Sequence, residues 1–272
     1  MRVLVTGITG FIGSHIAEEL RNRGYEVLGT VRQAEKVAIA EYELIYCKNI
    51  FTATEDDLVN ITQNVDAVIH CAWYVNHNDY LISPYNIDAA IGTTQLAKAS
   101  IKSGIKHFIG IGSCFEYDLS SSMPLSNKSP LRPNTVYGHA KVAAYHNLKA
   151  IFLPSNIRFN WARLFYVYGD GEPKTKLYSY IKNQIISNEE IKLGPCEIYR
   201  DYIHVDLAAK QIVDLISSDN VGDVNICTGS AIKLKDFAME LAKTLNGQHL
   251  IEFSENTVER PNNETPIIFG ER

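Results

Sequence analysis

Apolar residues follow two alternating patterns from Met1 to Leu164. Short runs rich in valine, isoleucine and leucine alternate with longer stretches in which apolar residues recur every three or four positions. Strands are expected at residues 3–5, 26–31, 43–46, 66–71, 107–112 and 157–164, and helices at 11–23, 55–64, 79–103 and 134–150. This regular alternation predicts an α/β fold with a doubly wound parallel sheet.

The turn after the first expected strand contains three glycines, Gly7, Gly10 and Gly13, at a spacing of three. A helix follows from Phe11 and Ile12 onward. Free N–H groups at a helix N-terminus attract anions, and the missing Cβ atoms let a phosphate approach the backbone. A strand, a glycine turn and a helix in this order predict a site for the pyrophosphate of a dinucleotide.

The pattern becomes less regular after Tyr168. A helix over 178–187, a short strand near Ile191, a segment over 201–216 and a helix over 234–245 are expected there. We interpret residues 1–168 as a dinucleotide-binding domain. Residues 169–272 are expected to form a smaller substrate-binding lobe, interleaved with the last strands of the sheet.

The composition argues against several classes of function. The chain has 272 residues and a net charge of −5 without a basic run, so no nucleic-acid partner is expected. No apolar stretch is long enough to span a membrane and Met1 leads directly into a strand, which favours a cytoplasmic protein. The five cysteines form no CxxC pair, which indicates reduced thiols. His70, His139 and His204 lack ligand spacing, so no metal is expected.

The end of the second strand indicates which dinucleotide fits. An acidic residue there accepts hydrogen bonds from the ribose of NAD, whereas an arginine accommodates the 2′-phosphate of NADP. The chain has Val31 and Arg32 there and no carboxylate before Glu35, which favours NADP(H) and leaves NAD as the alternative. Further candidate contacts to the dinucleotide are Asn49, Ile50, Cys71, Ala72 and Trp73, of which Trp73 could equally be a core residue.

Three residues suggest the chemistry. Tyr137 and Lys141 are four positions apart on an expected helix, so both lie on one face. An adjacent ammonium would lower the pKa of the tyrosine and make it a usable acid or base near neutral pH. Ser113 ends the strand over 107–112 and could orient a carbonyl or hydroxyl group. With a hydride carrier, this set predicts oxidation of an alcohol or reduction of a ketone.

Six segments resemble the extended short-chain dehydrogenase/reductase family, in its group of nucleotide-sugar epimerases, dehydratases and reductases. They are TGITGFIG at 6–13, DAVIHCA at 66–72, GSCFEY at 112–117, YGHAK at 137–141, ARLFYVYG at 162–169 and RDYIHVD at 200–206. The resemblance implies a Rossmann-type fold, a bound NAD or NADP and a nucleotide-diphosphate-sugar substrate. It also implies that Ser113, Tyr137 and Lys141 form the catalytic triad.

The resemblance further implies contacts with the substrate and with a second subunit. Arg200 matches an arginine that binds the nucleotide or diphosphate, although it could instead pair with Asp201, and Arg260 resembles a second such arginine. The helices over 79–103 and 134–150 resemble those of a four-helix dimer interface, so a homodimer is expected. The candidate substrate-binding residues are Ser113, Cys114, Phe115, Tyr166, Arg200 and Arg260.

Differences from the family pattern narrow the reaction. The 4,6-dehydratases of the family carry an Asp-Glu pair where this chain has Cys114 and Phe115, and neither residue can supply that acid and base. The family's epimerase-reductases have a cysteine at the position of Phe115, which argues against ring-carbon epimerisation. Tyr166 replaces an asparagine that contacts the substrate.

Two enzymatic hypotheses remain, and the first is preferred. An NADPH-dependent 4-ketoreductase would deliver hydride to C4 of a nucleotide-linked 4-keto-6-deoxysugar, whereas an NAD-dependent 4-epimerase would oxidise C4 and return the hydride to the other face. Arg32 favours the reductase. A non-catalytic dinucleotide sensor ranks last, because Tyr137 and Lys141 are both present.

Overall fold

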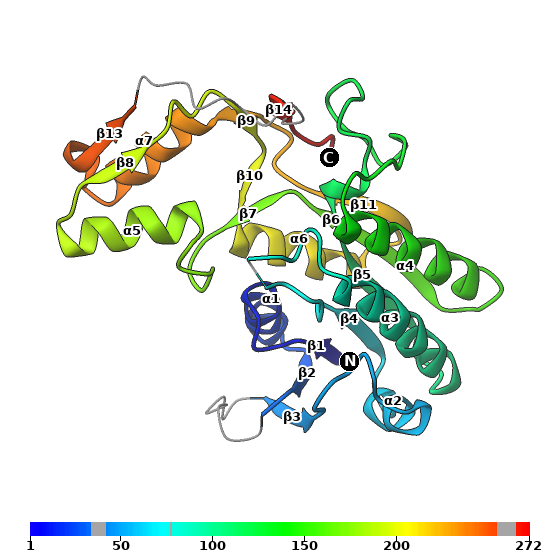
Figure 1. Ribbon diagram of the computed structural model, residues 1–272. Helices are drawn as coiled ribbons and strands as arrows, with labels where there is room; N and C mark the ends of the chain where they lie inside the picture. The colour runs from blue at the N-terminus through cyan, green and yellow to red at the C-terminus, as the bar shows by residue number, and fades with distance from the viewer. Residues whose placement is uncertain (34–41, 77, 255–264) are drawn as a thin grey trace.

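The computed structural model describes residues 1–33, 42–76, 78–254 and 265–272. Its central sheet has seven strands in the order β11-β6-β5-β4-β1-β2-β3, and all neighbouring pairs are parallel (Figure 1). The strands are β1 (Arg2–Thr6), β2 (Glu26–Val31), β3 (Glu43–Tyr46), β4 (Ala67–His70), β5 (His107–Ser113), β6 (Arg158–Leu164) and β11 (Gly222–Ile226). The predicted α/β fold with a doubly wound parallel sheet is confirmed.

Helices cover both faces of the sheet, because each of them has an apolar face to bury. One face carries α1 (Phe11–Asn22) and α6 (Val205–Ser217), and the other carries α2 (Glu55–Thr62), α3 (Tyr85–Lys102) and α4 (Val136–Phe152) (Figure 1). The side chains of Val3, Leu4 and Val5 in β1 are completely buried between these layers. The continuous apolar run of β1 is therefore explained by burial on both sides.

A smaller lobe continues from the end of β6. Its helices α5 (Leu177–Ser187) and α7 (Leu234–Thr244) pack against each other around Ile181 and Ala238. Its short strands pair as β7 (Tyr166–Tyr168) with β10 (Tyr202–His204), β8 (Ile191–Leu193) with β13 (Ile251–Phe253), and β9 (Tyr199–Arg200) with both β12 (Ile232–Lys233) and β14 (Ile267–Ile268).

The chain passes between the lobe and the sheet more than once. β10 leads directly into α6, and β11 then joins the sheet beside β6 before β12 returns to the lobe. The sequence pattern did not predict β11, since Gly222, Asp223 and Asn225 have low strand propensity. β11 can tolerate these residues because it lies at the edge of the sheet.

Helix α3 begins later than the predicted 79–103, at Tyr85. Pro84 precedes it, and a proline disfavours the helical conformation of the residue before it, here Ser83. Residues 78–84 instead form turns, with hydrogen bonds such as that from the Ser83 N–H to the Asp79 carbonyl (2.9 Å). This turn segment lies against the N-terminus of α4, where the Tyr137 N–H donates to the Leu81 carbonyl (3.1 Å).

Within the described ranges, no helix is both long and apolar enough to cross a lipid bilayer. The same part of the chain contains no group of three or more histidine, cysteine or acidic side chains arranged to hold a metal ion.

Candidate active site

The turn between β1 and α1 is shaped to hold an anion. Gly7 has a left-handed backbone with φ of +68°, and no described side chain caps α1 after Gly10. A Cβ on Gly13 would lie 2.2 Å from the carbonyl oxygen of Gly7, so only glycine lets the helix approach the turn this closely. The N–H groups of the first helical turn therefore receive no side-chain cap from the described residues, and this turn fits the pyrophosphate of a dinucleotide.

The end of β4 lies directly beside this turn. A Cβ on Gly7 would come within 3.1 Å of the backbone nitrogen of Ala72, and the Ala72 N–H donates to Thr6 Oγ1 (3.2 Å). Cys71 and Trp73 flank Ala72 and are half-buried. The structure thus brings three of the predicted dinucleotide contacts next to the glycine turn.

The end of β2 also adjoins the turn, because the Gly7 N–H donates to Thr30 Oγ1 (3.2 Å). Arg32 follows β2 and is exposed, so its guanidinium is free to meet a phosphate from solvent. Asn49 is exposed after β3. The Ile50 side chain is only 7% exposed and belongs to the core, so any contact of Ile50 with a ligand would come from its backbone.

His70 has a structural role beneath these residues. Its Nδ1 is hydrogen-bonded to Thr6 Oγ1 (2.7 Å) and its Nε2 to Thr93 Oγ1 (2.9 Å). Burial lowers the pKa of His70 to about 3, and the positive charge of Lys141 acts in the same direction. His70 is therefore a neutral residue that joins β1, β4 and α3.

β5 and α4 bring the predicted catalytic residues together. β5 ends at Ser113, and Thr135 caps α4 by accepting a hydrogen bond from the Gly138 N–H (3.0 Å). This cap orients the first turn of α4, which carries Tyr137. The Ser113 side chain lies close enough to the Tyr137 phenol to affect its titration. Lys141 follows one turn later, and its ammonium is buried.

Burial changes the acid–base properties of this trio. It raises the pKa of Tyr137 above its ordinary value, and the nearby Ser113 side chain opposes this only in part. It also lowers the pKa of Lys141 to about 7, against the attraction of Glu116 and Cys71.

The expectation that Lys141 lowers the pKa of Tyr137 is wrong for this geometry. The Lys141 ammonium donates to the carbonyl of Ile111 (2.6 Å) and lies 5.8 Å from the centroid of the Tyr137 ring. The ammonium is therefore directed at the backbone of β5, and burial dominates the titration of the phenol.

Two aromatic rings fix the plane of Tyr137. Trp73 and Tyr80 both meet it edge to face, with ring centroids 6.3 Å and 5.4 Å away. Tyr80 was not among the predicted site residues, because it lies in the turn segment that the sequence pattern assigned to a helix. The only available signal was Pro84, which indicates a later start of the helix.

Glu116 anchors the other side of the site, and sequence reasoning also missed it. It belongs to the short 3₁₀ helix η2 (Cys114–Glu116), and its carboxylate accepts hydrogen bonds from the Ser113 N–H (2.7 Å) and from Arg163 Nε (2.7 Å). Trp161 Nε1 donates to the same carboxylate (2.9 Å). Glu116 and Arg163 are both fully buried. This ion pair therefore holds the backbone of Ser113 in place.

The predicted substrate-binding residues lie beside Ser113. Cys114 is buried, and burial raises the pKa of its thiol to about 12, so the thiol stays protonated near neutral pH and is not available as a base. Phe115 packs edge to face on Tyr166, with centroids 6.2 Å apart. Arg200 is buried, and its guanidinium carbon lies 5.3 Å from the centroid of the Tyr166 ring.

Arg200 also donates from Nη1 to the carbonyl of Tyr199 (2.8 Å). The Asp201 carboxylate accepts hydrogen bonds from the backbone of Thr228 (2.8 Å) and Gly229 (3.0 Å). Asp201 thus organises the loop after β11. Arg260 and Glu35 lie outside the described residues.

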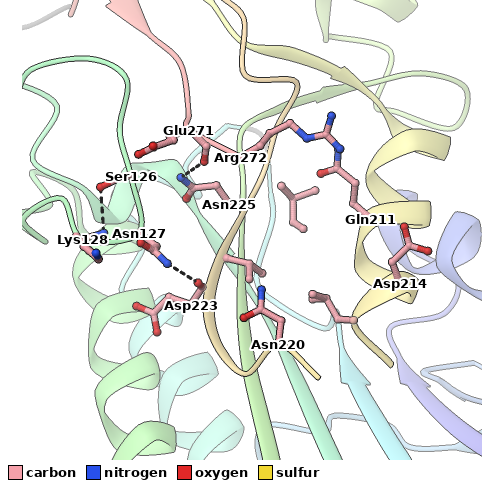
Figure 2. Close-up of a pocket in the computed structure, with 13 residues that line it drawn as sticks. Ser126, Asn127, Lys128, Gln211, Asp214, Asn220, Asp223, Asn225, Glu271 and Arg272 are labelled. Carbon is pink, nitrogen blue, oxygen red and sulfur yellow. Dashed lines mark hydrogen bonds between the residues drawn. The ribbon is translucent and has the colours of Figure 1, made fainter. Parts of the chain in front are cut away.

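A polar pocket of about 470 Å³ lies elsewhere, along the edge strand β11 (Figure 2). Gln211, Asp214, Asn225 and Arg272 are among the residues that line it. None of the predicted site residues lines this pocket, and β6 separates β11 from β5, which carries Ser113. We therefore assign the chemistry to the trio at the end of β5 and not to this pocket.

Comparisons with known proteins agree with this geometry. The model of the family described as "NAD dependent epimerase/dehydratase family" matches residues 3–227. The chain is 26% identical to the dTDP-6-deoxy-L-talose 4-dehydrogenase (NAD(+)) of Aggregatibacter actinomycetemcomitans over 86% of this chain and 87% of that protein. It is also 26% identical to the UDP-glucose 4-epimerase of Bacillus subtilis (strain 168), over 89% and 82% of the two chains.

A solved structure has the same fold. The UDP-glucose 4-epimerase of Thermotoga maritima, crystallised with UDP-glucose, superposes with a TM-score of 0.86 at 20% identity, over 100% of this chain and 90% of that chain. The family model covers most of the sequence, and the glycine turn and the motifs with Ser113, Tyr137 and Lys141 lie within it. The chain is therefore an extended short-chain dehydrogenase/reductase enzyme and belongs to the NAD dependent epimerase/dehydratase family.

Proposed function

We propose that this enzyme is an NADPH-dependent 4-ketoreductase that acts on a nucleotide-diphosphate 4-keto-6-deoxysugar. The observation that carries the proposal is the arrangement of Ser113 at the end of β5 with Tyr137 and Lys141 on α4, at the same sheet edge as the glycine turn. Reduction of a ketone needs an acid at this position, whereas oxidation of an alcohol needs a base. A relative named for dehydrogenation at C4 of a dTDP-linked 6-deoxysugar supports the same substrate class.

Each residue of the trio has its own role in the reduction of the ketone at C4. When bound, a reduced dinucleotide supplies the hydride for C4. The Tyr137 hydroxyl donates its proton to the oxygen that becomes negative at C4, and Ser113 donates a hydrogen bond to the same oxygen. Lys141, whose ammonium donates to the Ile111 carbonyl, would contact the ribose of the bound dinucleotide. The carbonyl thus gains one hydride and one proton and becomes an alcohol.

The residues after Ser113 favour reduction over elimination of water. A dehydratase needs a further acid and base next to the hydroxyl residue. Cys114 is buried with a raised thiol pKa, and Phe115 has no titratable group. The side chains of Phe115, Tyr166 and Arg200 contact one another, and we assign them to binding of the nucleotide diphosphate.

The two parts of the chain are expected to bind different ligands. We propose that residues 1–168 hold the dinucleotide and that residues 169–272 hold the sugar nucleotide, with α6 and β11 returning to the sheet. All five cysteines are free thiols, which suits a cytoplasmic enzyme.

The direct test is an assay of the purified full chain with NADPH and dTDP-4-keto-6-deoxyglucose, followed by absorbance at the nicotinamide band. We expect oxidation of NADPH only when the keto sugar is present. A protein that retains stoichiometric NAD through purification and oxidises no NADPH with 4-keto sugars would contradict the reductase.

The alternative is an NAD-dependent 4-epimerase, favoured by the similarity to a UDP-glucose 4-epimerase. The same three residues would serve it, because oxidation and re-reduction at C4 use one acid–base group in both directions. Conversion of UDP-glucose to UDP-galactose without net consumption of a dinucleotide would identify this activity.

Arg32 is expected to determine the preference for NADPH. Replacing it with alanine should weaken NADPH binding roughly 10- to 100-fold and leave NADH binding nearly unchanged, because only NADPH carries the 2′-phosphate. Titration of nicotinamide fluorescence with each dinucleotide gives both dissociation constants. Lys106→Ala is the control, since Lys106 pairs with Asp66 at the opposite end of the strands. An equal loss for both dinucleotides would argue against this role.

We propose that the enzyme is a homodimer through the outer face of α3 and α4. Ile87 and Ile91 lie one turn apart on α3 and are 47% and 54% exposed. Ile91→Glu should raise the dimer dissociation constant roughly 100-fold, because each subunit would bury an uncompensated carboxylate. Sedimentation velocity measures this, with Ile186→Glu on α5 as a control that is 73% exposed. A wild-type monomer, or an unchanged Ile91→Glu dimer, would refute this interface.

A further inference from the structure

The ammonium of Lys141 has a second neighbour that the family motifs do not assign. It lies 3.5 Å from the centroid of the Trp73 ring, well within the range of a cation–π interaction. Its hydrogen bond to the Ile111 carbonyl (2.6 Å) comes from β5. The end of β4 and the end of β5 thus hold the ammonium between an aromatic face and a carbonyl oxygen.

Trp73 is itself fixed by a buried residue. Its Nε1 donates to Asn86 Oδ1 (2.8 Å), and Asn86, on α3, is completely buried. The Asn86 amide also donates to the carbonyls of Tyr80 (2.6 Å) and Ser83 (2.9 Å). Asn86 therefore links the indole to the turn segment that packs on Tyr137.

We propose that Trp73 is a positioning residue for the catalytic lysine: its indole face holds the Lys141 ammonium, and its Nε1 bond to Asn86 fixes that face relative to Tyr137. Lys141 is catalytic only if the proposed function holds, and in that respect the proposal rests on it. The position of the ammonium itself is a property of the folded chain, and it can be measured without a substrate.

The surroundings of Lys141 make the protonation of its amine sensitive to Trp73. Burial lowers its pKa to about 7, while Glu116 on η2 and Cys71 after β4 raise it. The other facing groups are His70, which burial keeps neutral, and Tyr137 on the same helix. An aromatic face stabilises the ammonium over the neutral amine, so removing it should lower the pKa of Lys141 further, by about 0.5 to 1.

The first experiment measures tryptophan fluorescence of the full chain between pH 5.5 and 9. The chain has two tryptophans, so the difference between wild type and Trp73→Phe isolates Trp73. We expect the Trp73 emission to follow one proton with a midpoint near pH 7. Trp161, 5.9 Å from the ammonium, contributes the remainder, and Trp73→Phe measures its share.

Two variants of Lys141 serve as controls. Lys141→Met should abolish the transition, and Lys141→Arg should abolish it while retaining the cation, because a guanidinium does not titrate in this range. Circular dichroism confirms the fold of each variant. Emission of Trp73 that does not change with pH, or the same transition in a folded Lys141 variant, would overturn the proposal.

The second experiment compares Trp73→Phe with Trp73→Leu in the pH profile of turnover. Activity should fall as the pH rises through about 7, since the ammonium is the active form. In Trp73→Leu this fall should move to lower pH by about 0.5 to 1 unit, whereas Trp73→Phe keeps an aromatic face and should shift it less. Identical profiles for wild type and Trp73→Leu would contradict the positioning role.

The two hypotheses can fail separately. If the fluorescence transition depends on Lys141 but no 4-keto sugar is reduced, the proposed reaction is wrong and the position of the ammonium stands. If the sugar is reduced but the Trp73 emission is independent of Lys141, the proposed reaction stands and the positioning role of Trp73 is wrong.

Discussion

Replacing Tyr137 with phenylalanine is expected to lower kcat roughly 1,000-fold with NADPH and a 4-keto sugar nucleotide, because the reaction loses its proton donor. The substitution removes one hydroxyl and keeps the ring. Trp73 and Tyr80, which meet the ring edge to face, retain their contacts, so we expect no loss of the fold. Binding of NADPH should change less than threefold by comparison, as the hydroxyl is one contact among many.

The effect of Tyr137→Phe is measured from the initial rate of NADPH oxidation and from the dissociation constant of NADPH. Tyr25→Phe is a matched control that also removes one phenolic hydroxyl. Tyr25 lies between α1 and β2, at the amino end of the strand, and packs on the core there. Its variant should keep the wild-type rate.

A Tyr137→Phe variant that retains more than a tenth of the activity would show that another group donates the proton. Tyr80 is the candidate within the described site, because its ring lies 5.4 Å from that of Tyr137. If neither the wild type nor the variant reduces any ketone, the hypothesis of a non-catalytic dinucleotide sensor becomes the better one.

Local patterns explain why the fold and the trio could be predicted from the sequence. The strand, the three glycines and the helix are contiguous, and the requirement for glycine at position 13 is local, since a Cβ there would meet the Gly7 carbonyl. Tyr137 and Lys141 share a helix face by spacing alone. Ser113 could be placed because strand ends of a parallel sheet meet at one edge.

The remainder of the site depends on contacts between distant segments. The carboxylate of Glu116 meets Arg163 across 47 positions of sequence, and no local pattern indicates that both are buried. The direction of the Lys141 ammonium depends on Ile111 and Trp73, which lie on two other strand ends. The prediction about the pKa of Tyr137 was wrong for this reason. The spacing of Tyr137 and Lys141 correctly places both on one helix face, but burial of the phenol determines its pKa.

Glu116→Gln is expected to destabilise the protein by about 3 kcal/mol, because it leaves Arg163 as a buried charge without its main partner. The guanidinium is fully buried, and Asp223 Oδ2, 3.1 Å from Nη1, is its second anion. The rings of Tyr117 and Tyr145 lie 5.1 Å and 4.7 Å from the guanidinium carbon and leave it little room to move.

A glutamine cannot replace this carboxylate in either orientation. One carboxylate oxygen accepts from the Ser113 N–H and the other from Arg163 Nε, so the amide NH₂ would face a donor on one side or the other. If it faces Arg163, stability falls. If it faces Ser113, the end of β5 shifts and kcat falls as well, by roughly tenfold, because misplacing a catalytic hydroxyl weakens its contact with the reacting oxygen.

Urea unfolding followed by circular dichroism measures the loss of stability, and the NADPH assay measures kcat on the same samples. Glu55→Gln is the control, since Glu55 forms an exposed ion pair with Lys102 and should not shift the urea midpoint detectably. Adding Arg163→Met to Glu116→Gln should restore part of the stability, because no buried cation then remains without a partner. An unchanged midpoint in Glu116→Gln would show that the pair does not hold the end of β5.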